Sequence, residues 1–110
     1  MAATLGNLNI EVLSKTASQE DALRVLLALC DDDFNGNNGE EYICEEALEA
    51  GYQSDAEYYF KQNLAKGLNL IDAIEDVLTA QFESDSYYDD YRLEVVEHED
   101  FYIIATTYLS

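Results

Sequence analysis

Residues 70–82 have the sequence LIDAIEDVLTAQF, which divides its side chains between two faces of a helix. Apolar residues recur at three- and four-residue spacing, the period of an α-helix that buries one side. The apolar set is Leu70, Ile71, Ile74, Val77, Leu78 and Phe82. The opposite face presents Asp72, Glu75, Asp76 and then Glu83. The stretch therefore predicts a helix, capped by Asn69, with an apolar face toward the core and an acidic face toward solvent.

Three more helices are predicted upstream of this stretch. Residues 16–19 (TASQ) have the form of a capping box and open an apolar run that ends near Cys30. This run is apolar over most of its circumference, so it predicts the central core helix. Residues 54–57 (SDAE) form a second capping box and predict a helix to about Lys66. Residues 40–50 favour a short helix that stops at Gly51.

Strand patterns lie near both ends of the sequence. Leu8, Ile10 and Val12 alternate with polar residues over 7–14, which predicts a half-buried strand, although these residues could instead extend the following helix. Residues 92–98 and 101–108 are rich in β-branched and aromatic residues and predict an antiparallel hairpin. The expected fold is α+β: four or so short helices packed on a small antiparallel sheet with a C-terminal β-hairpin. Residues 1–110 are expected to form a single acidic domain.

Charge is the abnormal feature of the composition. The chain has 24 acidic and 5 basic residues, a formal net charge of −19. A small domain needs a net charge of only about 2–8 for solubility, and self-repulsion beyond this destabilises a compact fold. Direct binding to nucleic acid or to an anionic membrane is excluded, because both need a basic face and the basic residues are scattered. A basic protein surface is the partner that this charge favours.

The cellular setting follows from what the sequence lacks. Residues 1–13 have no basic region typical of a signal peptide, and no run approaches the ~20 apolar residues that span a bilayer. We therefore expect a cytoplasmic protein of a bacterial host cell, with Cys30 and Cys44 reduced. A disulfide between the two cysteines stays open as the alternative.

A calcium-loop pattern lies in a stretch that glycines and asparagines predict to be a loop, residues 31–39. Asp31, Asp33 and Asn35 place side-chain oxygens at loop positions 1, 3 and 5, and Gly36 follows for the turn. Position 12 is Tyr42, where a bidentate glutamate is needed. Calcium held by Asp31, Asp33 and Asn35 is one hypothesis, and a solvated acidic loop without any cofactor is the other.

Catalytic signatures are missing from the sequence. The single histidine, His98, lies at the predicted hairpin turn among carboxylates and is interpreted as an exposed turn residue. There is no glycine-rich phosphate loop, no C-x-x-C pair and no nucleophile elbow. We therefore expect a protein that is not an enzyme.

Rows of carboxylates and tyrosines are the remaining candidates for a binding surface. Helical residues four apart are separated by ~6 Å along the axis, a pitch that a groove built for phosphates ~3.4 Å apart can accept. Tyrosine beside a carboxylate also suits arginine, through stacking and bidentate hydrogen bonds. The predicted partner-binding residues are Asp72, Glu75, Asp76, Glu83, Asp85, Tyr87, Tyr88, Asp89, Asp90, Tyr91, Glu41, Glu45, Glu46 and Glu49.

In size, charge and lack of catalytic groups, the chain resembles the small acidic DNA-mimic inhibitors of phages and mobile elements, such as anti-restriction and anti-CRISPR proteins. The resemblance is compositional and covers the whole chain. It implies a partner that is a basic nucleic-acid-binding protein, such as a nuclease or a CRISPR effector complex, whose cleft the protein occupies. Two alternatives stay open: an immunity protein that neutralises a cationic nuclease toxin, and a calcium-binding module with a degenerate EF-hand-like loop at 31–42. The oligomeric state also stays open.

Overall fold

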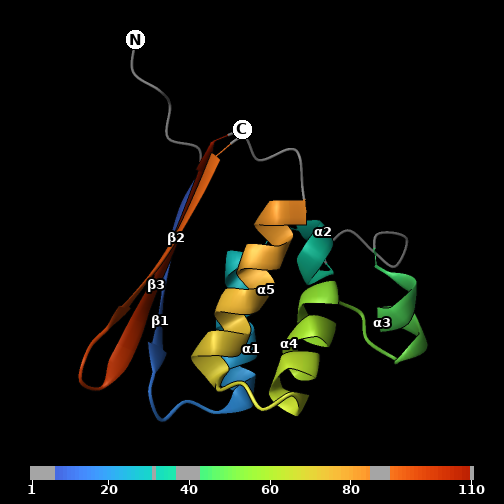
Figure 1. Ribbon diagram of the computed structural model, residues 1–110, viewed down its shortest axis with the longest axis horizontal. Coiled ribbons are helices and arrows are strands. Elements are labelled where there is room, and N and C mark those ends of the chain that lie inside the picture. The colour runs from blue at the N-terminus through green and yellow to red at the C-terminus, as the bar shows by residue number, and fades with distance from the viewer. Residues whose placement is uncertain (1–6, 31, 37–42, 85–89, 110) are drawn as a thin grey trace.

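The computed structural model describes residues 7–30, 32–36, 43–84 and 90–109. Its elements, in chain order, are β1 (Asn7–Ser14), α1 (Gln19–Leu29), α2 (Asp32–Asn35), α3 (Glu45–Glu49), α4 (Asp55–Ala65), α5 (Leu70–Ser84), β2 (Asp90–Glu97) and β3 (Phe101–Leu109). The strands form one antiparallel sheet in the order β1-β3-β2. Helices α5 and α1 lie beside one face of this sheet, α4 lies beyond them, and α3 lies farthest from the sheet (Figure 1). The predicted α+β class and the C-terminal hairpin are confirmed.

The core lies between the sheet and the helices. Ile74 and Leu78 of α5, Leu26 of α1 and Phe60 of α4 are fully buried and belong to one hydrophobic cluster. The sheet contributes Ile104 of β3, which is also fully buried. The apolar stripe read from residues 70–82 is therefore confirmed as the core-facing side of α5.

The orientation of β1 differs from the expectation. Leu8, Ile10 and Val12 were expected to be its buried side, but their side chains are 57 %, 55 % and 57 % exposed. Leu13 is 2 % exposed and pairs with Tyr102 in the register of the sheet. Because side chains alternate along a strand, burying Leu13 turns every even-numbered residue of β1 away from the helices.

The strand register therefore gives the sheet an apolar outer face, on the side away from the helices. Val12, Ile103 and Val96 are register partners across the three strands, as are Ile10, Ala105 and Glu94. The outer sheet face is defined by the side chains of Leu8, Ile10, Val12, Arg92, Glu94, Val96, Ile103, Ala105 and Thr107. Antiparallel sheets usually present polar residues on a face that no other element covers.

The starts of the three long helices were predicted with one error. Ser18, rather than Thr16, caps α1: its hydroxyl accepts a hydrogen bond from the Asp21 amide at 3.2 Å. The predicted caps of the other two long helices are confirmed, because the Ser54 hydroxyl accepts from the Glu57 amide at 3.2 Å and the Asn69 side-chain carbonyl accepts from the Asp72 amide at 2.9 Å.

The stretch expected to be a loop contains the short helix α2. Its end is fastened to neighbouring elements: the Asn35 side-chain amide donates to the Leu27 carbonyl at 3.1 Å, and the Ser54 hydroxyl donates to the Phe34 carbonyl at 3.1 Å. Gly36 follows with a φ of 89°, in the left-handed region. A Cβ at this position would collide with the Gln53 carbonyl oxygen. A close backbone approach therefore accounts for the glycine of the D-x-D-x-N-G pattern. The predicted start of the helix over 40–50 is wrong, because Cys44 has extended backbone angles and α3 begins at Glu45; residues 37–42 lie outside the described ranges.

Replacing Gly36 tests this close approach. Gly51 also has a φ of 89°, but a Cβ there has no neighbour within 4 Å. We expect Gly51→Ala to cost about 1–2 kcal/mol of unfolding free energy through backbone strain alone. Gly36→Ala should cost about 1–3 kcal/mol more, because the backbone must also shift. Urea unfolding of both variants measures the difference, and equal losses would contradict the close approach.

Candidate functional site

The exposed side of α5 carries a row of carboxylates, which we call the α5 acidic row: Asp72, Glu75, Asp76 and Glu83. Asp72, Asp76 and Glu83 are exposed, and Glu75 is half-buried. The helix has no lysine or arginine. From Asp72 to Glu83 the row extends about 16 Å along the helix axis, at 1.5 Å per residue. The mean spacing of its four charges along the axis is therefore about 5.5 Å, of the same order as the ~3.4 Å between phosphates of a single DNA strand.

Neighbouring elements hold two members of the α5 acidic row in place. The Asn63 side-chain amide, buried on α4, donates to Asp76 Oδ2 at 2.9 Å and to the Ala73 carbonyl at 3.3 Å. The Tyr91 hydroxyl on β2 donates to Glu83 Oε1 at 3.4 Å. These contacts order the two carboxylates while leaving their other oxygens available to a partner.

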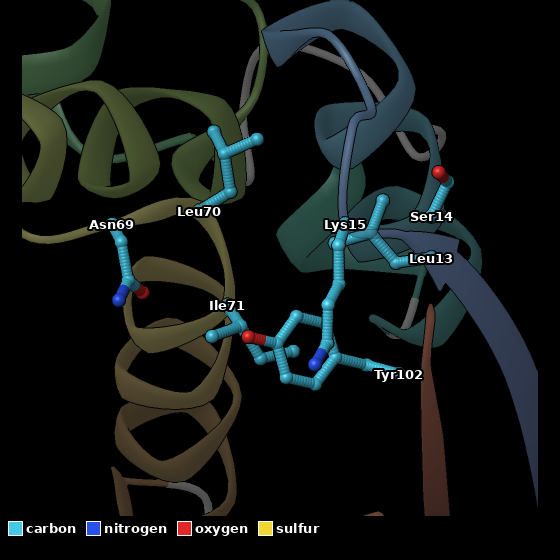
Figure 2. Close-up of a pocket in the computed structure, with 7 residues that line it drawn as sticks. All are labelled: Leu13, Ser14, Lys15, Asn69, Leu70, Ile71 and Tyr102. Carbon is cyan, nitrogen blue, oxygen red and sulfur yellow. The ribbon is translucent and has the colours of Figure 1, made fainter. Parts of the chain in front are cut away.

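A groove between the start of α5 and the end of the sheet extends the acidic row sideways. One hollow of about 400 Å³ is lined by Asn69, Ile71, Asp72, Glu75, Val95, Glu97 and Tyr102. An adjoining hollow of about 170 Å³ shares Asn69, Ile71 and Tyr102 and reaches Lys15 (Figure 2). Ile71 and Val95 give the groove an apolar floor, and three carboxylates surround it. Such a groove suits the stem and charged head of an arginine or lysine side chain.

Lys15 closes one end of this groove. Its Nζ lies 2.6 Å from Glu97 Oε2 and 5.3 Å from the centre of the Tyr102 ring. Figure 2 shows Lys15 beside Tyr102. The second ion pair within the described ranges joins Arg24 to Asp21 on α1 at 3.0 Å. Of the α5 acidic row, no member forms an ion pair with a residue that the structure describes. The row therefore keeps its negative charge, and within the described residues Glu97 is the one carboxylate of the groove that a cation neutralises.

The acidity of Glu75 reflects this crowding. Partial burial, and then the nearby Asp72 carboxylate, raise the pKa of Glu75 above its ordinary value. An opposite charge delivered by a partner would relieve both effects, because it favours the ionised carboxylate.

The predicted residues of α3 form a separate surface. Glu45, Glu46 and Glu49 are all exposed, and α4 lies between them and α5 (Figure 1). The start of α3 is tied to α4 through the Cys44 amide, which donates to Asp55 Oδ1 at 2.9 Å. The structure therefore does not join these carboxylates to the α5 acidic row. Glu41 lies outside the described residues.

Part of the predicted tyrosine-rich site lies outside the described ranges, namely Asp85, Tyr87, Tyr88 and Asp89, together with the side chain of Asp90. Tyr91 is described, and it packs against the core rather than standing free: its ring stacks on Phe82 with centroids 4.9 Å apart. Desolvation and the Glu83 carboxylate raise the pKa of Tyr91. Asp90 and Tyr91 belong to β2, which begins two residues before the predicted strand 92–98.

A second aromatic group lies between α2, α3 and α4. The rings of Tyr58 and Tyr59 meet edge to face at 5.3 Å, and Tyr59 stacks on Phe34 at 6.0 Å. The Cys44 sulfur lies 3.8 Å from the Tyr59 hydroxyl. This contact, followed by burial, raises the pKa of Tyr59 to about 12, and burial raises the pKa of the Cys44 thiol. Because Cys44 is a free thiol, the alternative of a disulfide with Cys30 is wrong.

The proposed calcium ligands are only partly described. Asp31 and the side chain of Asp33 lie outside the described residues, and the Asn35 amide holds the Leu27 carbonyl. Within the described part of the chain, no three histidine, cysteine or acidic side chains lie close enough together to hold a metal ion. Calcium binding by Asp31, Asp33 and Asn35 stays a prediction.

Sequence reasoning missed Glu97, Tyr102 and Lys15. A signal for Glu97 exists in β2, where Tyr91, Leu93 and Val95 alternate toward the core and Glu97 is next on the same side. A carboxylate at that position must emerge at the end of the sheet, beside whichever helix starts there. Whether Glu97 borders a groove then depends on where α5 starts beside the sheet, and the alternation in β2 alone does not predict the position of α5.

Comparisons with known proteins add no relative. No family model matches the chain, and neither a curated protein sequence nor a solved structure matches it. None of the helices within the described ranges has both the length and the apolar character needed to cross a membrane.

The raised pKa of Glu75 predicts a pH-dependent effect of Glu75→Gln. Since folding raises this pKa, the folded chain binds the proton more readily, and stability falls as pH rises from the ordinary glutamate pKa of about 4.3 through the raised value. Glu75→Gln removes that loss at pH 7 and changes little at pH 3. We expect a melting temperature about 1–3 °C above wild type at pH 7 only.

Glu49→Gln, an exposed change on α3, controls for the general loss of one negative charge. If Glu75→Gln raised the melting temperature equally at pH 3 and pH 7, the substitution would be acting through packing and not through charge.

Proposed function

We propose that the protein is a non-enzymatic inhibitor that presents the α5 acidic row as a substitute for DNA phosphates. The row occupies the basic nucleic-acid-binding cleft of a defence nuclease or a CRISPR effector. The observation that carries the proposal is the α5 acidic row itself: four carboxylates on one side of a rigid helix, with no cation among the described residues paired to them. The proposal places the protein in the cytoplasm of a bacterial cell, where such a target acts.

The distribution of charge along the helices is unfavourable for their stability, and this cost supports a role in binding. Lysine or arginine in the last turn stabilises a helix by offsetting its dipole, typically by about 0.3–1 kcal/mol. Each of the helices that the structure describes lacks a basic residue in its last turn. In α5 the end of the helix carries Glu83 instead, a charge of the unfavourable sign. A charge pattern chosen for stability alone would not place an acidic residue in the last turn of α5.

The groove beside α5 supports a second kind of recognition. Besides attracting the positive charge of a basic cleft as a whole, the protein can bind an individual arginine or lysine side chain of that cleft. A basic cleft offers arginine and lysine side chains at the positions where it normally meets phosphates. Asp72 and Glu75 are placed to receive one such side chain above Ile71 and Val95. Charged groups of this kind accelerate association and fix orientation more than they add affinity.

A competition experiment tests the proposal. Labelled duplex DNA is bound to each member of a panel of nucleases and CRISPR effectors with basic clefts, and its release by this protein is followed by fluorescence anisotropy. We expect release from at least one member, weakening steeply between about 50 and 300 mM salt, because the contacts are ionic. A panel arm containing cationic nuclease toxins detects the immunity-protein alternative.

Two triple variants separate the α5 acidic row from bulk charge. Asp72→Asn/Glu75→Gln/Glu83→Gln removes three charges from the row and keeps Asp76, which Asn63 holds. Glu20→Gln/Glu99→Gln/Asp100→Asn removes three exposed charges elsewhere. We expect the first variant to compete about tenfold or more weakly than the second. Equal weakening, with both variants folded by circular dichroism, would contradict the role of α5, and absence of release across the panel would contradict inhibition.

A further inference from the structure

Four of the six large hydrophobic side chains that are exposed within the described residues lie on the outer sheet face, apart from the α5 acidic row. Leu8, Ile10 and Val12 are more than half exposed, and Val96 beside them is 46 % exposed. Ile103 and Ala105 of the central strand β3 lie on the same face, between their register partners on the edge strands β1 and β2. The helices lie on the opposite side of the sheet (Figure 1). A contiguous apolar area of this kind marks an interaction surface in a soluble protein.

The charges on this face differ from those of the rest of the chain. The chain has a net charge of −19, but among the side chains that the structure describes, those of the outer sheet face include one basic residue, Arg92, and one acidic residue, Glu94. Both are exposed neighbours on β2, and Arg92 forms no ion pair with a described residue. Arg92 and Glu94 therefore offset each other within this face and can pair with each other between two copies, whereas the α5 acidic row offers a basic partner several carboxylates without any cation.

We propose that the outer sheet face binds a second copy of this chain, forming a two-fold dimer in which the two sheets pack face to face. Two sheets packed in this way lie ~10 Å apart with interdigitated side chains. If the two-fold axis runs across the strands between Arg92 and Glu94, Arg92 of each copy lies opposite Glu94 of the other. The same axis places Leu8 opposite Ile10, because these residues occupy the same register rows as Arg92 and Glu94.

The size of the face sets the strength of the dimer. Strands of eight, eight and nine residues cover roughly 27 Å by 14 Å, a projected area of about 400 Å². This is half of the ~800 Å² that each partner buries in a standard interface. We therefore expect a reversible dimer with a dissociation constant on the order of 10–100 µM.

Repulsion between two acidic copies opposes the dimer, and salt reduces that repulsion. The carboxylates of α5 lie on the side of the sheet away from the interface (Figure 1), so their repulsion acts over a long range, which shortens as the Debye length falls with added salt. Added salt therefore weakens the repulsion while the apolar contact remains. Dimerisation should tighten as salt rises, the reverse of the salt dependence expected for a basic partner, so the two surfaces are distinguishable in solution.

Analytical ultracentrifugation of the purified chain from about 1 to 500 µM, in about 50 and 500 mM sodium chloride, tests the proposal. We expect a monomer–dimer equilibrium that Ile10→Ser weakens at least tenfold. Leu48→Ser, at an exposed leucine on α3, should leave it unchanged. Arg92→Glu and Glu94→Arg should each weaken the dimer, and the double variant Arg92→Glu/Glu94→Arg should return it to within about threefold of wild type.

Three outcomes would overturn the proposal: a monomer at every concentration and salt, a dimer that Ile10→Ser leaves intact, or single charge reversals that the double variant does not rescue. A dimer that survives Ile10→Ser would instead assign association to another surface, such as the open edge of β1. A monomer whose binding to a nuclease is lost on Ile10→Ser would assign the outer sheet face to that partner. Neither result depends on whether the protein displaces DNA.

Discussion

The burial of one side of α5 is the constraint on which the rest of the structure depends. Ile74, Val77 and Leu78 are almost completely buried against the sheet and the neighbouring helices. A carboxylate in that position would lose its hydration, at a cost of several kcal/mol without a paired cation. The helix can therefore pack in only one rotation, and this rotation points Asp72, Asp76 and Glu83 to solvent together.

The same constraint explains why so acidic a chain folds. Self-repulsion acts through water and is screened within about 8 Å at physiological salt, whereas the core forms in a region from which the charges are excluded. Asn63 shows how the two regions meet, because its buried amide bridges the α5 backbone and the Asp76 carboxylate. The acidic surface is thus attached to a fully packed frame and presents its charges at fixed positions.

Much of the fold follows from sequence periodicity, and what does not follow has identifiable causes. The stripe of α5, the caps at Ser54 and Asn69 and the hairpin are local patterns, and local patterns are visible in a sequence. The outward direction of Leu8 in β1 is not local, because alternation defines two sides without saying which one the helices cover. The burial of Leu13 determines which side of β1 faces the helices. Thr16 and Ser18 are both acceptable caps, and only the position of the first turn selects Ser18.

The candidate site likewise has one part that local sequence patterns predict and another part that depends on tertiary packing. The carboxylates of α5 were predictable, because they share one helix. The groove was not, since Glu97, Tyr102 and Lys15 come from three segments that meet only after the sheet has paired and α5 has packed. The α3 carboxylates were predicted as a second row from their own helical spacing, and α4 separates them from α5 (Figure 1). Neighbourhood in the sequence carried no information about which acidic rows share a surface.

Two surfaces of opposite physical character lie on this small domain. One is a fixed row of unpaired carboxylates on α5, suited to long-range attraction. The other is a largely apolar sheet face, suited to short-range packing with its own copy. A two-fold dimer through the sheet would leave both α5 rows accessible, because the helices lie on the side of the sheet away from the interface (Figure 1).

The most direct measurement of the central claim is a map of where a cationic probe binds. An arginine-rich peptide is titrated into isotopically labelled protein at low salt, and backbone amide chemical shifts are followed by nuclear magnetic resonance. The account predicts that the largest changes fall on residues 72–83 of α5 and on Glu97 and Tyr102 beside the groove. Changes of equal size at Glu99 and Asp100 of the hairpin turn, or at Glu20 of α1, would show a diffuse acidic surface and contradict the claim.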